Sequence, residues 1–158
     1  MKRAQKPSQL RKEILSVLLF TFCLAMFLSL ISYSPDDPSF SFYNTNPQKI
    51  HNLLGVAGSF LSDLMLKIFG LSSFLLVLII FHFSICLFLT LQTNLTFVKS
   101  ISWLGLFFAS AGMLDLGLGK VSLGKFSGGA GGFLGQILST FLIKYLNIAG
   151  AYIFLALV

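Results

Sequence analysis

The sequence predicts an all-α membrane protein with four transmembrane helices, arranged as two hairpins of the same orientation. Of its 158 residues, 56% are hydrophobic and 10% are charged, whereas a soluble domain carries roughly a quarter charged residues. Long charge-free runs recur along the chain, and one segment repeats in its second half. This composition excludes an ordinary soluble enzyme, a disordered tail and a secreted disulfide scaffold.

Residues 14–33 form the first predicted span. They give about twenty residues without a charged side chain, which is close to the length that a helix needs to cross the hydrocarbon core. Residues 1–13 precede this span as a basic flank, in which Glu13 is the one acid. Such a flank is typical of the cytoplasmic side of a first span, so we expect a cytoplasmic N-terminus. The flank could also bind anionic lipid head groups or nucleic acid.

Three further spans are predicted, and they complete a polytopic membrane domain that covers residues 14–158. The span at 71–91 is free of charged side chains, and the span at 101–118 contains one acid. The apolar run at 148–158 has only eleven residues and, at about 1.5 Å per residue, is too short to cross the membrane. We therefore expect a truncated last span and a natural protein that continues past the last residue.

Two outer segments are expected, at residues 34–70 and 119–147. Directly after the first span, residues 34–39 contain two prolines and two adjacent carboxylates, which cannot continue a helix in lipid. The short polar turn from Gln92 onward is then expected on the cytoplasmic side.

A segment at residues 55–67 recurs at residues 132–144 with both of its glycines, a serine and the final lysine in matching positions. Each copy leads into an apolar run, so each half reads as a span, an outer connection, an amphipathic helix and a returning span. Two such halves make a parallel duplication. The polar stripe of this helix comprises Ser59, Ser62, Asp63 and Lys67 in the first copy, and Gln136, Ser139, Thr140 and Lys144 in the second.

A mostly apolar helix with one lysine-bearing face suits an element that lies at the membrane surface or packs across the outer mouth of a bundle. Asp63 and Lys67 also form an i,i+4 pair with the acid first, which contributes a few tenths of a kcal/mol when exposed. The alternative is that each copy is the outer end of one long tilted span, from which a lysine can reach the interface.

Catalytic, cofactor and metal sites are not expected in this chain. His82 lies within a span and is either a proton or substrate site or, as we favour, a neutral imidazole bonded to a neighbouring helix. Asp115 falls near the outer end of its span, where interfacial solvation explains it. The run from Gly119 imitates a phosphate-binding loop, but Phe126 stands where that loop needs Ser or Thr. Cys23 and Cys86 lie in apolar runs and read as small hydrophobes.

Two short motifs nevertheless resemble a known family. Tyr-Ser-Pro-Asp-Asp-Pro-Ser at residues 33–39 follows the first span directly, and Asn-Leu-Leu-Gly-Val-Ala-Gly follows at residues 52–58. Together they resemble the amino-terminal membrane region of FtsK/SpoIIIE-type DNA translocases, although Phe40 and Phe42 stand where family members often carry Trp. The family-motif residues are Tyr33, Ser34, Pro35, Asp37, Pro38, Ser39, Asn52, Gly55 and Gly58.

The resemblance implies a four-span anchor in the bacterial inner membrane at the division septum, which couples chromosome segregation to division. Its partners would be the lipid bilayer, other division proteins and further copies of itself. In such proteins a hexameric ATPase downstream of the anchor pumps DNA, so ATP, magnesium and DNA are expected only in that missing motor. Two alternatives remain open, a small transporter or channel subunit built from a duplicated two-span unit, and a membrane enzyme that acts on lipid.

Overall fold

The computed structural model describes residues 7–40, 50–89, 97–123 and 126–158. Residues 1–6 of the basic flank and the polar turn at residues 92–96 lie outside these described residues. The elements are α1 (Pro7–Ile31), α2 (Gly55–Phe69), α3 (Ser72–Phe88), α4 (Phe97–Leu118), β1 (Lys120–Leu123), β2 (Phe126–Gly129) and α5 (Gly132–Leu157).

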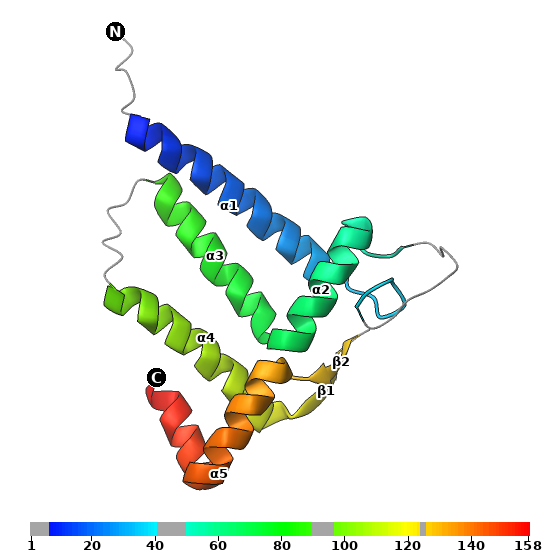
Figure 1. Ribbon diagram of the computed structural model, residues 1–158, viewed down its shortest axis with the longest axis vertical. Helices are drawn as coiled ribbons and strands as arrows, with labels where there is room; N and C mark the ends of the chain where they lie inside the picture. Colours follow the sequence, from blue (N-terminus) through cyan, green and yellow to red (C-terminus); the bar gives the residue numbers. More distant parts are fainter. Residues whose placement is uncertain (1–6, 41–49, 90–96, 124–125) are drawn as a thin grey trace.

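The helices pack as two neighbouring groups (Figure 1). Helix α3 returns alongside α1, with α2 lying across the end of this pair, and the last part of α5 returns alongside α4. Helix α2, the two strands and the first part of α5 all gather at the end of the bundle where α1 and α4 terminate. We call this the α2 end. The two segments predicted to lie outside the membrane therefore share one end of the molecule.

Within the described residues, three helices are long and apolar enough to cross a membrane, and they lie in α1, α4 and α5. A fourth candidate exists if α2 and α3 count as one bent span. These two helices meet at 109°, so the interpretation of the first amphipathic segment as the outer end of a long tilted span is wrong. Helix α1 ends at Ile31, two residues before the predicted boundary, because the polar turn begins there.

The prediction of an all-α protein is wrong at one place, since β1 and β2 form an antiparallel hairpin. Lys120 pairs with Gly129 and Leu123 with Phe126. Each strand has four residues, which is too short for a clear alternation of apolar and polar side chains. Glycine is also depleted in strands, so this segment reads in the sequence as a glycine-rich connection.

Positive backbone φ angles mark the start and the end of both amphipathic helices. Gly55 and Gly132 begin them with φ of 62° and 63°. Gly70 and Asn147, which both have φ of 59°, follow them, and Asn147 interrupts the helical geometry of α5. The predicted beginning of the fourth span at residue 148 therefore coincides with a kink inside α5.

Two apolar cores hold the helix groups together. The first, between α1, α2 and α3, is built around Met26, Leu66 and Val77, and the second, between α4 and α5, around Leu142 and Leu155. Many large apolar side chains on the spans stay exposed, as is expected where lipid is the solvent. The two groups are joined by a backbone hydrogen bond, in which the amide of Leu71 donates to the carbonyl of Ala130 at 2.8 Å.

Candidate functional site

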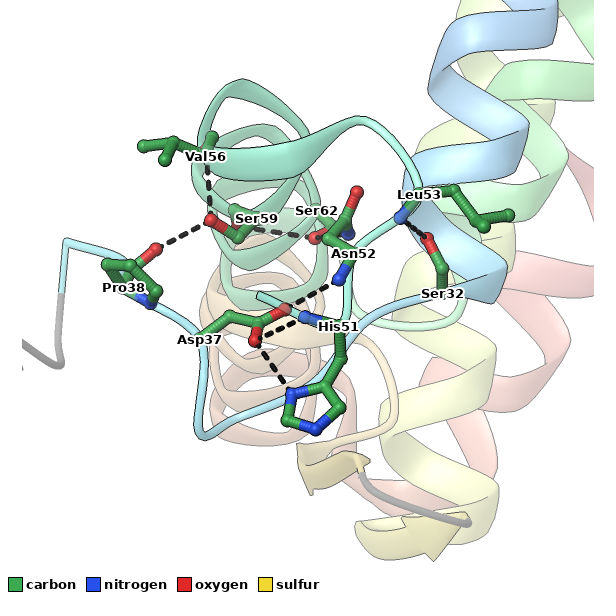
Figure 2. A network of polar contacts seen from close by, with 9 residues as sticks. All are labelled: Ser32, Asp37, Pro38, His51, Asn52, Leu53, Val56, Ser59 and Ser62. Atoms are coloured by element: carbon green, nitrogen blue, oxygen red, sulfur yellow. Dashed lines mark hydrogen bonds and ion pairs between the residues drawn. The ribbon is translucent and has the colours of Figure 1, made fainter. Parts of the chain in front are cut away.

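The carboxylate of Asp37 organises the chain at the α2 end (Figure 2). Asp37 is buried, and its amide donates to the carbonyl of Ser34 at 3.2 Å, which closes a turn that has Pro35 in a favoured position. One carboxylate oxygen accepts the backbone N–H of His51 at 2.9 Å and lies 3.1 Å from its Nδ1; the other accepts the backbone N–H of Asn52 at 2.8 Å. Asp37 therefore ties the two ends of the 34–54 connection together.

Asn52 connects this turn to α1 and α2. Its side-chain amide donates to the carbonyl of Ser29 at 2.9 Å and to Ser62 Oγ at 3.4 Å, and its Oδ1 accepts the backbone N–H of Leu54 at 3.1 Å. Each polar atom of this buried side chain is thus hydrogen-bonded, as burial requires.

The spacing of Asn52 and Gly58 in the family motif has a steric reason. A Cβ at Gly58 would overlap the side-chain oxygen of Asn52 and lie 2.6 Å from Leu54 Cβ. The carbonyl of Gly58 also accepts the hydroxyl of Ser29 at 2.6 Å. Only glycine lets α1, α2 and Asn52 approach this closely.

The first copy of the polar stripe faces inward, in a helix that packs across the end of the α1–α3 pair. Ser59, Ser62 and Asp63 are buried, and the Ser59 hydroxyl donates to the carbonyl of Pro38 at 2.7 Å. The described parts of the 34–54 connection lie against this face of α2, through Pro38 at Ser59 and Asn52 at Ser62. Lys67 alone stays half exposed, with its Nζ 2.7 Å from the Asp63 carboxylate.

Tyr33 also belongs to this cluster. Burial and then the nearby Asp63 carboxylate raise the pKa of the Tyr33 phenol, so this side chain stays neutral. Its ring makes an edge contact with that of Phe126, with 6.3 Å between centroids. A groove of about 220 Å³ lies between the two helix groups, and it is lined by Tyr33, Lys67, Gln136 and strand β2.

The second copy of the stripe is mostly open. Ser139 is buried and donates to the carboxylate of Asp115, so interfacial solvation alone does not explain that acid. Gln136, Thr140 and Lys144 are exposed. The physical reason is the connection, because strands β1 and β2 take the place of the residues, among them Pro38 and Asn52, that bond to α2.

Among the residues that the structure describes, His82 forms no hydrogen bond to a neighbouring helix, contrary to the prediction. Its Nε2 lies 3.5 Å from the sulfur of Cys86 on the same helix, and its ring contacts that of Trp103 on α4, with 5.3 Å between centroids. Cys23 and Cys86 are not bonded to each other. Within the described residues, no three His, Cys, Asp or Glu side chains are placed to hold a metal ion.

One cluster therefore contains the motif residues from Tyr33 to Pro38, Asn52, Gly58 and the first stripe. Of the second stripe, Gln136 borders this cluster at the groove, whereas Ser139 bonds to Asp115. Sequence reasoning missed three members of the network, namely Ser29 on α1, Ser32 directly after α1, and His51. Ser32 Oγ accepts the backbone N–H of Leu53 at 3.0 Å. The sequence pattern that could have indicated Ser29 and Ser32 is a pair of serines, three residues apart, at the end of an apolar run. The arrangement holds backbone segments in place and contains no reacting group beside a base.

Apolar helices of membrane-spanning length, joined at one end by a buried polar network, define a multi-pass helical membrane domain. This chain belongs to the family described as the 4TM region of DNA translocase FtsK/SpoIIIE, whose model matches residues 8–158.

Several curated relatives carry the name DNA translocase FtsK. The protein of Rickettsia prowazekii (strain Madrid E) is 31% identical over 136 residues, which cover 85% of this chain and 17% of the relative. That of Pseudomonas syringae pv. tomato (strain ATCC BAA-871 / DC3000) is 28% identical over 160 residues, covering 92% of this chain and 19% of the relative. The chain thus spans less than a fifth of the relatives' length. No solved structure matches it.

Proposed function

We propose that this membrane domain anchors an FtsK-type DNA translocase at the bacterial division septum and contacts other division proteins there. The observation that carries the proposal is a pair of exposed apolar side chains at the α2 end, outside the spans. Phe40 and Leu53 are 70% and 65% exposed. The backbone N–H of Leu53 is nevertheless bonded to Ser32 Oγ, and the Phe40 ring makes an edge contact with that of Phe60, with 4.9 Å between centroids. Exposed apolar side chains on a fixed backbone are typical of a protein contact.

Localisation of the full-length protein, carrying a fluorescent tag in dividing cells, tests this proposal. Replacing Phe40 and Leu53 by Ala should leave the protein in the membrane fraction but disperse it from the septum. The matched control replaces Leu78 and Leu104, which are equally apolar and exposed on the spans; it should keep the septal signal. Septal signal in the Phe40 and Leu53 variant would contradict the proposal.

In the whole protein, this domain would tether a cytoplasmic ATPase that moves DNA during chromosome segregation. Support comes from the relatives' name, DNA translocase, and from their length, since more than four fifths of each lies beyond the matched region. ATP, magnesium and DNA would then bind to that remaining part. The purified chain should show no DNA-stimulated ATP hydrolysis. Measurable ATP hydrolysis by the chain would contradict the proposal that the ATPase lies in the remaining part of the protein.

The α2 end would face away from the cytoplasm in the bacterial inner membrane. The support is charge placement, because Arg11 and Lys12 lie at the opposite end of α1 and basic flanks stay on the cytoplasmic side. A reporter enzyme that is active only outside the cytoplasm should be active when fused after Phe40 and inactive after Leu89. The reverse pattern would invert the orientation.

A parallel duplication would explain the plan of the domain. Its support is that Gly55 and Gly132, and likewise Gly70 and Asn147, share positive φ angles and have the same spacing along the chain. An experimental structure tests the duplication by superposing residues 55–69, with the bend that follows them, on residues 132–146 and their bend. Failure of the two segments to superpose would contradict the duplication. The transporter or channel alternative loses its support to the family match, and no contact of His82 favours it.

A further inference from the structure

Helices α1 and α3 leave an apolar groove of about 300 Å³ in the half of the bundle away from the α2 end. Val17 and Phe20 on α1, and Ile85 and Phe88 on α3, form its rims, and all four side chains are exposed. The groove therefore opens on the surface that faces lipid. None of the functions considered above uses it.

Two small residues create this groove. Ser16 and Ser84 are 1% and 2% exposed and form its floor. The Ser84 hydroxyl donates to the carbonyl of Ser16 at 2.8 Å, and the Ser16 hydroxyl to the carbonyl of Glu13 at 2.7 Å. Both hydroxyls are thus directed to backbone partners, and the surface left between the large rims is apolar. In a bilayer such a surface suits an acyl chain.

A positive charge lies directly beyond one end of the groove. Lys12, Ser16 and Phe20 are spaced four residues apart on α1, which puts them along one face of the helix. Lys12 therefore stands about one turn, roughly 5.4 Å, beyond the serine floor. Arg11 precedes it, and both side chains are exposed. Glu13, the one acid in this turn, is partly buried and already engaged in a contact.

We propose that this groove binds an anionic phospholipid, with one acyl chain between the rims and the phosphate at Lys12 and Arg11. The charge decides between an acyl chain and an apolar helix as the occupant. A purely apolar partner helix would gain nothing from two cations at the groove's end, whereas a phospholipid offers both an apolar chain and a phosphate.

Native mass spectrometry of the full chain, released from detergent with phosphatidylglycerol or phosphatidylcholine, tests the site. The chain should retain phosphatidylglycerol at least fivefold better than phosphatidylcholine. Replacing Arg11 and Lys12 by Gln should abolish this preference, whereas replacing Lys120 and Lys144, exposed lysines near the α2 end, should leave it unchanged. Equal retention of the two lipids by the unchanged chain would overturn the proposal.

A second pair of variants tests the groove itself. Ile85→Trp fills the groove and should lower retention of phosphatidylglycerol severalfold, while Leu78→Trp, on the exposed surface of the same helix, should not. Unchanged retention in Ile85→Trp would mean that the basic flank binds head groups without the groove, and the proposal would fail. The proposal would also fail if added inorganic phosphate displaced the bound lipid. It would fail as well if the spectra showed dimers of the chain, with the groove covered by the second copy, and no bound lipid.

Discussion

The backbones of Gly70 and Gly132 lie directly against each other where the two helix groups meet. Both residues have positive φ, and a methyl group on either would overlap the amide nitrogen of the other. Beside them, the amide of Leu71 donates to the carbonyl of Ala130 at 2.8 Å. The bend between α2 and α3 is therefore held against the start of α5, and this junction keeps the two groups in one arrangement.

Gly70→Ala should destabilise the domain by more than about 2 kcal/mol, because the new methyl group adds an overlap with backbone to the strain of a positive φ. Gly55→Ala is the matched control, since Gly55 has a similar φ but nothing within 4 Å of a Cβ. That change should cost only about 1 kcal/mol. Unfolding of both variants in detergent micelles measures the difference, and equal losses would mean that the glycine contact is unimportant.

Asn52→Ala should cost about 1–3 kcal/mol, because it removes the side-chain partner of the buried Ser29 carbonyl and of the part-buried Leu54 amide. Gln136→Ala, which removes an exposed side-chain amide, should change stability by less than about 0.5 kcal/mol.

A double-mutant cycle isolates the steric link between Asn52 and Gly58. Gly58→Ala should be less harmful when Asn52 is already Ala, since one of the two overlaps is then gone. Some loss should remain because of Leu54 Cβ. Additive effects on the free energy of unfolding would show that these two motif residues act independently.

Lys67→Met should destabilise the domain because it leaves the buried carboxylate of Asp63 without its cation. The loss should stay below the 3–5 kcal/mol typical of fully buried pairs, since Lys67 is 46% exposed. We expect about 1–2 kcal/mol on that basis. Lys144→Met, at the corresponding place in the second stripe, should have almost no effect, because Lys144 is exposed, with its Nζ 5.7 Å from the centroid of the Tyr145 ring.

Asn147 adopts a backbone conformation, φ 59° and ψ 172°, that is almost exclusive to glycine and costs other residues about 1–3 kcal/mol. Its side-chain oxygen accepts the backbone N–H of Ile148 at 2.7 Å, which offsets part of this strain. Asn147→Gly should therefore keep the kink and near-normal stability, whereas Asn147→Val should lose 1 kcal/mol or more, by the same estimate. A thermal unfolding series in micelles separates these outcomes, and a stable Val variant would contradict the strain.

The amino-acid sequence by itself determined where the chain enters lipid. A span depends on the hydrophobicity of about twenty consecutive residues, which is a local property, so the runs beginning at residues 14 and 101 predicted helices of the right length. The repeat likewise placed the break after the second amphipathic segment at Asn147, where the helical geometry is interrupted.

Only the tertiary structure decided which polar side chains are covered. The two stripes have similar sequences, yet Asp63 is buried, while Thr140 at the matching position is exposed. The partners of Asp37 and Asp115 are also distant along the chain, at positions that no local pattern indicates. Burial depends on what the connecting segment lays over a helix, and that is set by packing between elements and not by the periodicity of any one of them.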